Sequence, residues 1–575
     1  MQVREASAED ASSNAEHRPN ILWIVGENLC LDLGCYGAEH VVTPNLDGLA
    51  ANGVRYVNVF STSPVCAPSR SALMTGMYQT TTGTHPMRSH RDDDFRLPSG
   101  VRPLTHWLAD EGYTTGNVTH IGDRRVGTGK LDLNFVNEGD IYQTNDWSAL
   151  TSSEPFFAQI NLPEVEYDIY DRKSAEKPRV KWVGEEWHPQ VVKPADVEPP
   201  PYYPEHRIVR EEWARYLNSV SGMDVRVGWI LEALEKQGLT DNTIVVFFAD
   251  NGRLEARGIH WCWDSGLHVP MIVRWPKNFP PPEHYEVNSV DRRMISLLDL
   301  TATTLWMAGI ERPPLMQSRR FLGENLEAER QFVFSARDRI DETVVRQRSV
   351  RDERYHYIRT HTPGVGFATL NRYKEKCFLV KPLMREMLAA GTLTGPAAEL
   401  MQPLPEELLY DTRSDPHEIH NLAESTKVVH QEALIRLRAA LDTWIVETGD
   451  QGQWPEPAEI VAPFEQEMHD WFGTPEWYRD EGAHFSIHNC PNRKRERGVF
   501  AMKRFGLFAL LLAFGVGVIG CSEATQNEAS EAVQQTGEAI ESAADDAANV
   551  TEGAIEGVKD AVDENTDEPE ADKAE

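Results

Sequence analysis

The sequence predicts an α/β protein: a mostly parallel central sheet sandwiched by helices, followed by a smaller C-terminal α+β domain. Three apolar runs, at 20–26, 155–162 and 243–249, are continuous enough to be strands buried on both faces. Helix-compatible segments alternate with such strands, which is typical of a parallel sheet. From residue 332 the pattern changes to short, hairpin-like strands, which indicates the second domain.

Length and charge limit the classes of function. At 575 residues the chain is long enough for two or three compact units, and its hydrophobic content of 41% suits a packed protein. The net charge of -33 argues against nucleic acid as a partner, because phosphates would be repelled. An anionic substrate is still compatible with it, since a local basic pocket can oppose the overall field. The 7 cysteines are odd in number and contain no CxxC pair, so neither a zinc ribbon nor a disulfide scaffold is indicated.

The other elements of the first domain follow from periodicity and stop signals. Apolar residues at helical spacing between 208 and 237 predict a long helix with a core-facing side. The proline-rich stretch 199–204 predicts a stiff, extended linker over the surface. The remaining expected elements are strands at 54–60, 113–120 and 271–276, and helices from near Ser69, at 105–112 and at 295–309.

The second domain is expected to contain a small sheet and a closing helix. Its strands are predicted at 332–337, 343–350, 354–359 and 405–411, and its helix at 428–447. The predicted organisation is a disordered leader at 1–18, a catalytic domain at 19–330, a small-sheet subdomain at 331–450, a linker or closing segment at 451–501, an apolar segment at 502–521 and an acidic, disordered or weakly helical tail at 522–575.

A cysteine-containing block at 63–76 follows the expected strand 54–60 and opens a helix. Cys66 therefore lies at a strand-to-helix turn, near amide donors that favour anions. Arg70 lies four residues later, so a helix that begins near Pro68 would bring its cation toward the cysteine. The alternative is that Cys66 is a small buried hydrophobic residue, as most isolated cysteines are.

The order Cys-x-Pro-x-Arg, followed by Ser-Ala-Leu-Met-Thr-Gly, resembles the signature of the sulfatase family. In that family the cysteine is oxidised after translation to formylglycine, whose hydrated aldehyde is the nucleophile. Segments 33–37 and 43–47 strengthen the resemblance, and 337–339 and 407–411 resemble the subgroup that includes heparan N-sulfatase. The resemblance covers about residues 18–445 and implies a formylglycine-generating or sulfatase-maturing enzyme as a partner.

Two strand ends supply candidate metal ligands. Glu27 and Asn28 follow the first apolar run, and Asp250 and Asn251 follow the third. Their hard oxygen atoms suit Ca²⁺ or Mg²⁺ better than zinc, and the resemblance assigns them, with Cys66, to the metal site. Asn28 departs from the carboxylate usual in the family and removes one negative charge. The alternatives are a solvent-facing strand end and an Asp-Asn-Gly turn without metal.

Two further residues have expected catalytic roles. Lys130, in the glycine-rich stretch 127–135, matches the family lysine that contacts the sulfate and the nucleophile, although the histidine expected two residues later is Asp132. After the second apolar run the family usually has a histidine that protonates the leaving oxygen or binds the sulfate. Glu166 lies there instead and could act as a general acid if burial raised its pKa. The alternatives are a solvated lysine and an exposed loop carboxylate.

Candidate substrate-binding residues lie in two loops. His85 belongs to a Gly/His/Arg loop at 82–91 that is compatible with contacts to an anionic sugar or with a basic surface. In a later block, Ile259 occupies the position of a family lysine that contacts the sulfate. Arg257 and His260 are the candidate substitutes for that lysine.

The function implied by the resemblance is hydrolysis of a sulfate ester or sulfamate on a sulfated carbohydrate. One alternative is a phosphate or phosphonate ester hydrolase, because related enzymes share the fold and metal position. Another is a catalytically silent glycan-binding protein, because Asn28, Glu166 and Ile259 all replace residues that the chemistry normally uses.

The C-terminal region contains a segment that is unexpected at its position. A basic start at 502–504, an apolar run at 505–520 and Cys521 resemble a bacterial lipoprotein signal. The run of roughly 16 residues is shorter than the ~20 that span a bilayer. It is interpreted as a joined lipoprotein sequence, as a membrane anchor through 505–521 or as a buried helix. Residues 1–19 contain no apolar signal core, so a location in the cell envelope or periplasm is implied by the family resemblance alone.

Overall fold

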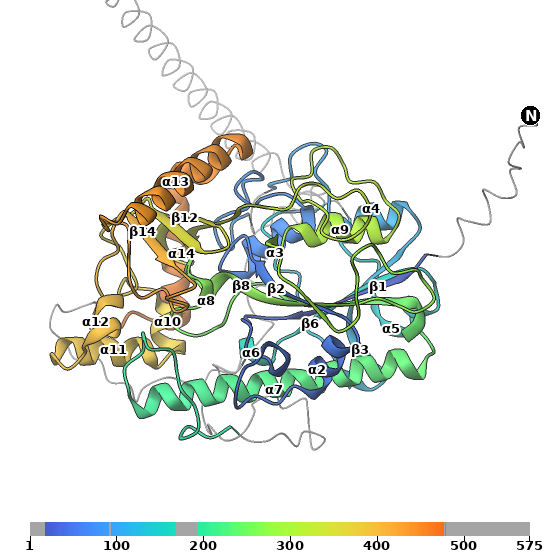
Figure 1. The fold of residues 1–575 in the computed structure, drawn as a ribbon, viewed down its shortest axis with the longest axis horizontal. Helices are drawn as coiled ribbons and strands as arrows, with labels where there is room; N and C mark the ends of the chain where they lie inside the picture. Colours follow the sequence, from blue (N-terminus) through green and yellow to red (C-terminus); the bar gives the residue numbers. More distant parts are fainter. Residues whose placement is uncertain (1–17, 91–93, 138, 168–191, 476–477, 479–575) are drawn as a thin grey trace, which may run out of the picture. The chain divides into compact units, whose positions relative to one another are not determined.

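A mixed sheet of ten strands lies at the centre of the computed structural model (Figure 1). Its strand order is β10-β2-β8-β7-β1-β6-β3-β4, with β5 paired to β3 and β9 to β2. The strands are β1 (Asn20–Gly26), β2 (Val54–Phe60), β3 (Thr114–Ile121), β4 (Arg124–Arg125), β5 (Thr144–Asp146), β6 (Phe156–Leu162), β7 (Thr243–Ala249), β8 (His268–Arg274), β9 (Ser289–Asp291) and β10 (Ile295–Ser296). Most pairs are parallel, as predicted, whereas β8 runs antiparallel to both β2 and β7.

The register of β1 determines where the site forms. Gly26, the last residue of β1, is paired with Ala249 of β7 on one side and with Leu162 of β6 on the other. All three strands run in the same direction, so they end at one edge of the sheet. Ligands of open α/β sheets bind at this edge.

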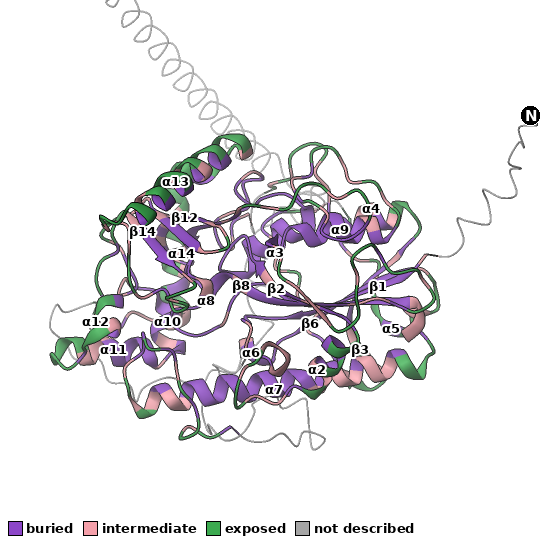
Figure 2. Cartoon of the chain, in the orientation of Figure 1, coloured by how far each residue is buried: buried purple, intermediate pink, exposed green. Residues whose placement is uncertain are grey.

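Helices cover both faces of the sheet. Figure 1 shows α3, α4 and α9 on one face and α2 and α7 on the other. The long helix α7 turns an apolar stripe inward, including Val220, Met223 and Val227, all fully buried (Figure 2). The helices of this part are α2 (Pro44–Ala51), α3 (Cys66–Thr75), α4 (Leu104–Asp110), α5 (Trp147–Thr151), α6 (Glu164–Tyr167), α7 (Arg207–Lys236), α8 (Asp264–Leu267) and α9 (Asp299–Met307), with 3-10 turns η1 (Gly34–Tyr36) and η4 (Thr240–Asn242).

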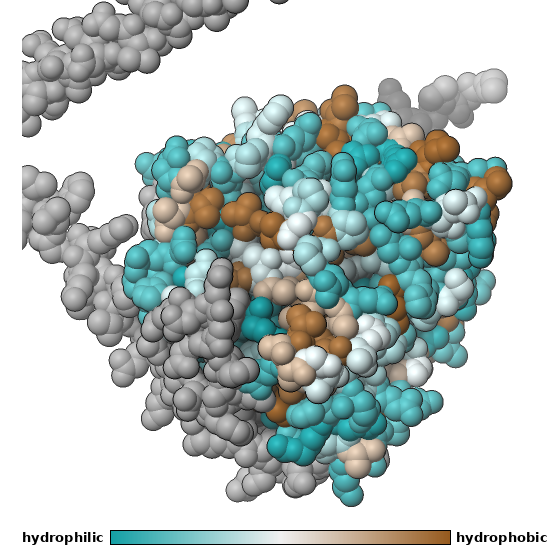
Figure 3. Space-filling model, turned by 90° about the vertical axis from the view of Figure 1, so that its left-hand side faces the viewer, coloured by the Kyte–Doolittle hydropathy of each residue, from teal (hydrophilic) through white to brown (hydrophobic). Residues whose placement is uncertain are grey.

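A four-stranded antiparallel sheet, in the order β11-β12-β13-β14, forms the small sheet that was predicted for the C-terminal domain. Its strands are β11 (Val333–Ile340), β12 (Thr343–Arg351), β13 (Tyr355–Thr360) and β14 (Glu407–Asp411), and its helices are α10 (Arg372–Cys377), α11 (Val380–Ala389), α12 (Gly395–Leu400), α13 (Val428–Thr448) and α14 (Ala458–Phe472), with η5 (Gln451–Gln453) between the last two. Helix α13 packs on β12 and β13. The side of the molecule in Figure 3 is mainly hydrophilic, with apolar side chains in scattered groups.

The structure describes residues 18–90, 94–137, 139–167, 192–475 and 478. The expectations for most of the leader, the apolar segment 502–521 and the tail 522–575 fall outside these residues, and the predicted domain boundaries stay predictions. In the part that is described, no helix combines the length and hydropathy needed to cross a bilayer. The five cysteines of that part are free, which agrees with the absence of a disulfide scaffold.

Three predicted elements were wrong in detail. The helix expected near Pro68 begins at Cys66 itself, because proline fits the first helical turn. The helix expected at 295–309 begins at Asp299, since Ile295 and Ser296 pair with β2 as β10. The stretch 199–204 is a turn in which the Tyr203 amide donates to the Pro200 carbonyl at 3.0 Å, and its tyrosines are buried, so it is no surface linker.

His361, which follows β13, should make the stability of the folded protein depend on pH. Burial, and then the charges of Arg348 and Arg346, lower the pKa of His361 to about 4. The folded protein therefore prefers the neutral imidazole, and this contribution to stability is complete above about pH 6.5 and is lost as the pH falls toward 4. Between pH 7 and pH 5 we expect the wild type to lose about 1–2 kcal/mol of unfolding free energy relative to His361→Gln, measured by urea denaturation. If the free energy of unfolding changes with pH in the same way for both proteins, this prediction is contradicted.

Candidate active site

The ends of β1 and β7 bring four buried polar side chains together, as the sequence predicts. Glu27, Asn28, Asp250 and Asn251 are each fully buried. The Asn28 amide N–H donates to Asp250 Oδ1 at 3.2 Å, and Asn251 Nδ2 donates to Asn28 Oδ1 at 2.9 Å. Asn28 has a left-handed backbone with φ of 57°, a conformation that clusters at functional sites. The carboxylates and amide oxygens thus form one cluster.

Cys66 is the first residue of α3 and lies against this cluster. Its Sγ is 3.7 Å from Asn28 Oδ1, and the residue is 4% exposed. The hydroxyl groups of Ser61, in the loop before Cys66, and of Ser69, in the first turns of α3, donate to the Asp250 carbonyl at 3.0 and 2.5 Å. The start of the helix and the end of β7 are therefore held in direct contact.

Arg70 lies one helical turn after Cys66 and forms ion pairs with Asp250 and Glu27. Its Nε donates to Asp250 Oδ2 at 2.8 Å, and its Nη2 lies 3.5 Å from Glu27 Oε1. Nη1 donates to Asn161 Oδ1 at 2.7 Å. Arg70 is 5% exposed, so its guanidinium contacts the groups of the site and hardly any solvent.

Lys130 reaches the cluster from the other side. Its Nζ lies 3.1 Å from Glu27 Oε2, 2.9 Å from Glu166 Oε2 and 3.8 Å from Asp132 Oδ2. The predicted lysine and Glu166 are thus brought into one ion-paired group with Glu27. A carboxylate that is ion-paired with a lysine lacks the proton that a general acid must give, so this contact favours a positioning role for Glu166.

Burial and charge act on these groups in opposite directions. Burial raises the pKa of the Cys66 thiol to about 12, although the charge of Lys130 lowers it, so the unmodified residue is a thiol and not a thiolate. Burial also raises the pKa of Glu27, against the charges of Lys130 and Arg70. An unmodified Cys66 is thus a poor nucleophile here.

Two oxygen atoms of the cluster lack a hydrogen-bond donor. Glu27 Oε1, which lies 3.5 Å from Arg70 Nη2, and Asn251 Oδ1 are buried and accept no hydrogen bond from any described residue. Buried acceptors of this kind are normally satisfied, and each one requires an explanation. Together with the carboxylate of Asp250 and the amide oxygen of Asn28 they form an all-oxygen donor set, which fits a hard divalent cation.

Asn161 of β6 is a site residue that sequence reasoning missed. It accepts from Arg70, and its Nδ2 donates to the Lys130 carbonyl at 3.0 Å and to Asn117 Oδ1 at 3.1 Å. It therefore holds both cations of the site. The signal was present, because Asn161 and Gln159 are amides in an otherwise apolar strand, and buried amides need polar partners.

Two of the predicted substrate-binding residues lie outside the contacts made around Cys66, and their roles stay predictions. His260 is 4% exposed, and its amide donates to the Pro64 carbonyl at 2.8 Å, next to the loop that holds Cys66. His85 is partly exposed in its loop, and burial lowers the pKa of its imidazole.

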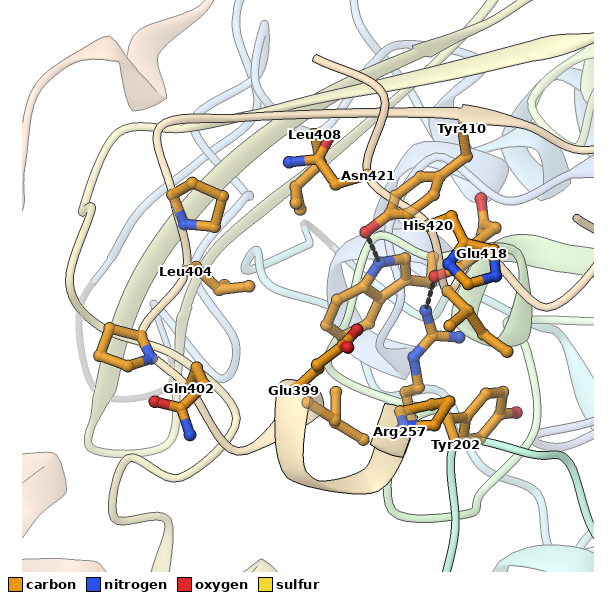
Figure 4. Close-up of a pocket in the computed structure, with 16 residues that line it drawn as sticks. Tyr202, Arg257, Glu399, Gln402, Leu404, Leu408, Tyr410, Glu418, His420 and Asn421 are labelled. Atoms are coloured by element: carbon orange, nitrogen blue, oxygen red, sulfur yellow. Dashed lines mark hydrogen bonds between the residues drawn. The ribbon is translucent and has the colours of Figure 1, made fainter. Parts of the chain in front are cut away.

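Arg257 lines a separate cavity of about 490 Å³. Its guanidinium stacks on the rings of Tyr202 and Trp263, at 4.3 and 4.1 Å from their centroids, and its Nη2 donates to the Glu418 carbonyl at 2.8 Å. Figure 4 shows Arg257 and Tyr202 at one end of the cavity and Leu404 and Gln402 at the other. Arg257 thus has structural partners of its own, and its predicted contact with sulfate stays a prediction.

A second group of possible metal ligands is explained by ion pairs. His356 Nδ1 lies 2.5 Å from Glu418 Oε1 and 3.6 Å from Asp264 Oδ1. Arg351 lies 3.2 Å from Asp264 Oδ2, and the Asp264 amide donates to Glu418 Oε2 at 2.7 Å. These contacts join the loop after β7 to the small sheet.

The fold and the site define an α/β protein in which a buried cysteine begins a helix beside an oxygen-rich cluster. The sulfatase family model matches residues 19–310, which is more than half of the chain. An ulvan-active sulfatase from Formosa agariphila is 34% identical over 77% of this chain and 77% of its own length. The chain belongs to the sulfatase family.

Two further comparisons agree with this assignment. Human N-sulphoglucosamine sulphohydrolase is 26% identical over 75% of this chain and 90% of its own length. The solved structure of a 2-O GAG sulfatase has a TM-score of 0.52 and 20% identity, and the match covers 77% of this chain and 96% of that one. At this identity the structural likeness bears on the fold alone.

Proposed function

We propose that the protein hydrolyses sulfate esters or sulfamates on a sulfated carbohydrate, with Cys66 converted to formylglycine. The observation that supports this most is the contact of Cys66, at the first position of α3, with the oxygen cluster at 3.7 Å. As its hydrate, formylglycine at this position would supply an oxygen nucleophile that the buried thiol does not. This proposal requires a formylglycine-generating or sulfatase-maturing enzyme as a partner.

Glu27, Asn28, Asp250 and Asn251 would hold a Ca²⁺ or Mg²⁺ ion, which when bound would offset the charge of the sulfate and acidify the nucleophile. The neutral Asn28 reduces the charge of this donor set. The carboxylate of Asp250 is oriented by two backbone amides, those of Asn28 and Asn251.

The two cations have distinct roles in this proposal. Arg70 is held by Asp250 and Asn161, so it keeps the oxygen ligands in place and supplies fixed positive charge behind them. Lys130 has a side chain that is 17% exposed, and its Nζ is close to both Glu27 and Glu166. We assign Lys130 to the stabilisation of the negative charge on the sulfate oxygens.

The relatives favour one class of substrate. The names of two relatives refer to ulvan and to N-sulphoglucosamine, so a sulfated sugar is favoured for this chain. A cell-envelope or periplasmic location would give access to such polymers. Membrane association through 505–521 depends on residues that the structure does not describe.

The direct test compares hydrolysis of an aryl sulfate with that of an aryl phosphonate by protein co-produced with a maturing enzyme. We expect the kcat/KM for the sulfate to exceed that for the phosphonate by at least about tenfold, and chelation to abolish both until Ca²⁺ or Mg²⁺ is restored. A preference for the phosphonate would favour the phosphoester alternative. Binding of a sulfated glycan without turnover would favour the silent glycan-binding alternative.

Glu166 allows a separate prediction. If it positions Lys130, Glu166→Gln should lower kcat/KM by about tenfold or less, and equally for sulfates with good and poor leaving groups. A general acid would instead be needed mainly for the poor leaving group. The measurement is a leaving-group series with both proteins, and a steeper dependence in the variant would contradict the positioning role.

A further inference from the structure

Basic side chains gather beside the loop that precedes Cys66. We define the cationic cluster as Arg88, Arg337 and Lys374, together with the neutral imidazole of His260. Burial, and then the charges of Lys374 and Arg337, hold the pKa of His260 well below its ordinary value. Four segments far apart in the sequence therefore contribute to one positively charged region.

Main-chain hydrogen bonds place this cluster next to the nucleophile loop. His260 donates its amide to the Pro64 carbonyl at 2.8 Å. Ala336, the neighbour of Arg337, donates its amide to the Thr62 carbonyl at 2.9 Å. Both segments are thus bonded to residues within four positions of Cys66.

Arg337 is a buried cation with incomplete hydrogen bonding. It is 2% exposed, and its Nε and Nη1 have no hydrogen-bond partner among the described residues. Its guanidinium lies over the Trp261 ring, 4.1 Å from the centroid. By contrast Arg348, on the adjacent strand, donates to both Asp338 and Asp450. Burial lowers the pKa of Arg337 to about 9, against the charges of Cys262 and Asp338.

Lys374 of α10 adds a second buried basic group. It is 3% exposed, its Nζ donates to the Leu254 carbonyl at 3.4 Å, and it lies 3.8 Å from the centroid of the Phe378 ring. Burial, followed by the charge of Lys381, holds its pKa well below the ordinary value, and Glu255 offsets this only in part. A buried basic group that carries its charge is costly unless an anion joins it.

Asp338 and Asp341, which follow Arg337 in the sequence, are engaged by arginines other than Arg337. Asp338 Oδ1 lies 3.2 Å from Arg348 Nη2. Asp341 lies 3.4 Å from Arg88 Nη1 and also accepts from Asn371 Nδ2 at 3.4 Å. Arg88 is therefore ion-paired with Asp341, whereas the Nε and Nη1 atoms of Arg337 have no partner among the described residues.

Two local backbone distortions lie at residues of the cluster. The register of β11 against β12 shifts between Arg337 and Arg339, and β-bulges of this kind re-aim side chains next to active sites. His260 has a left-handed backbone with φ of 83°. Such a backbone is unfavourable for histidine and typical of functional positions.

We propose that the cationic cluster binds an anionic group of the sugar, a carboxylate or a second sulfate, while the sulfate to be cleaved lies at Cys66. This inference rests on the proposed function for the position of the cleaved sulfate. Arg337 supplies the planar, paired donors that such groups accept, and Lys374 adds a point charge. The cluster would then select for polyanionic glycans.

Kinetics of Arg337→Met with two kinds of substrate test the proposal. For a sulfated oligosaccharide that contains a uronate, or for a disulfated sugar without uronate, we expect kcat/KM to fall at least tenfold. For an aryl sulfate with no other charge we expect a change of less than twofold. Arg354→Met, which removes an exposed arginine before β13, is the control for the change in net charge and should affect neither substrate.

A binding measurement separates this inference from the proposed function. Calorimetry with an unsulfated uronate disaccharide, and with a disulfated sugar on Cys66→Ala, should show binding that Arg337→Met weakens at least tenfold and Arg337→Lys weakens less. The ligand-free Arg337→Met protein should melt no lower than the wild type, because a poorly compensated buried charge is removed.

The possible outcomes can be told apart. If Arg337→Met affects only the ligands that contain a uronate, the cluster binds a carboxylate. If it affects only the disulfated sugar, the cluster binds a second sulfate. Equal losses for the aryl sulfate and the oligosaccharide would place Arg337 on the cleaved sulfate and overturn the proposal, as would binding that is insensitive to Arg337→Met. If no sulfate is hydrolysed but uronate binding depends on Arg337, the proposed function fails and the anionic site stands.

Discussion

Replacement of Cys66 by alanine is expected to lower kcat/KM for an aryl sulfate by at least about 10⁴, because it removes the side chain that is proposed to supply the nucleophile. The change removes a small side chain, so the fold should persist. The burial of Cys66 and the raised pKa of its thiol imply that the unmodified cysteine is also nearly inactive. Protein made without a maturing enzyme should therefore behave like the variant.

The matched control for this prediction is Cys35→Ala, which changes a free cysteine of η1 whose amide bonds to Asp47. Its kcat/KM should stay within about threefold of the wild type, since Cys35 lies outside the cluster. Activity of Cys66→Ala above one per cent of wild type, with a preparation shown to be free of contaminating enzyme, would contradict the assignment of the nucleophile.

Replacement of Asp250 by asparagine should have the second largest effect, a loss of about 10³ or more in kcat/KM. Asp250 is a proposed cation ligand, and it also pairs with Arg70 at 2.8 Å. Loss of its charge weakens the cation site and leaves Arg70 buried with less compensation. We therefore also expect the free energy of unfolding to fall by about 3 kcal/mol.

Asp224→Asn is the control for Asp250→Asn, because Asp224 is another buried aspartate. It accepts the backbone amides of Asn45 and Leu46 at the start of α2 and has no role in the site. This variant should change stability but leave kcat/KM within about threefold. The measurement is kcat/KM across a Ca²⁺ and Mg²⁺ titration. An Asp250→Asn enzyme that keeps more than a tenth of wild-type activity at saturating metal would argue against the cation site.

The sequence was informative where local pattern and strand polarity determine position. Glu27 and Asp250 follow apolar runs, and parallel strands that end at one edge must bring such residues together. Cys66 was predictable as a strand-to-helix residue. The exact start of α3 was not, because a proline in the first turn is compatible with a helix that starts before it.

Long-range contacts account for most of what the sequence did not indicate. Asn161 is recognised as a site residue only when β6 is seen beside β1, and Arg337 only when β11 is seen bonded to the loop at Thr62. Arg257 and His260 are near neighbours in sequence, yet one lines a separate cavity and the other adjoins the nucleophile loop. Periodicity gives no information about such separations.

The most direct test of Cys66 as the source of the nucleophile is the intact mass of the peptide that contains it, from protein purified from its native host. Conversion to formylglycine removes about 18 Da. We expect the shifted peptide to be present, and its fraction to follow the specific activity of the preparation. A peptide that contains only unmodified cysteine, in a preparation that nevertheless hydrolyses sulfate esters, would contradict the proposed nucleophile.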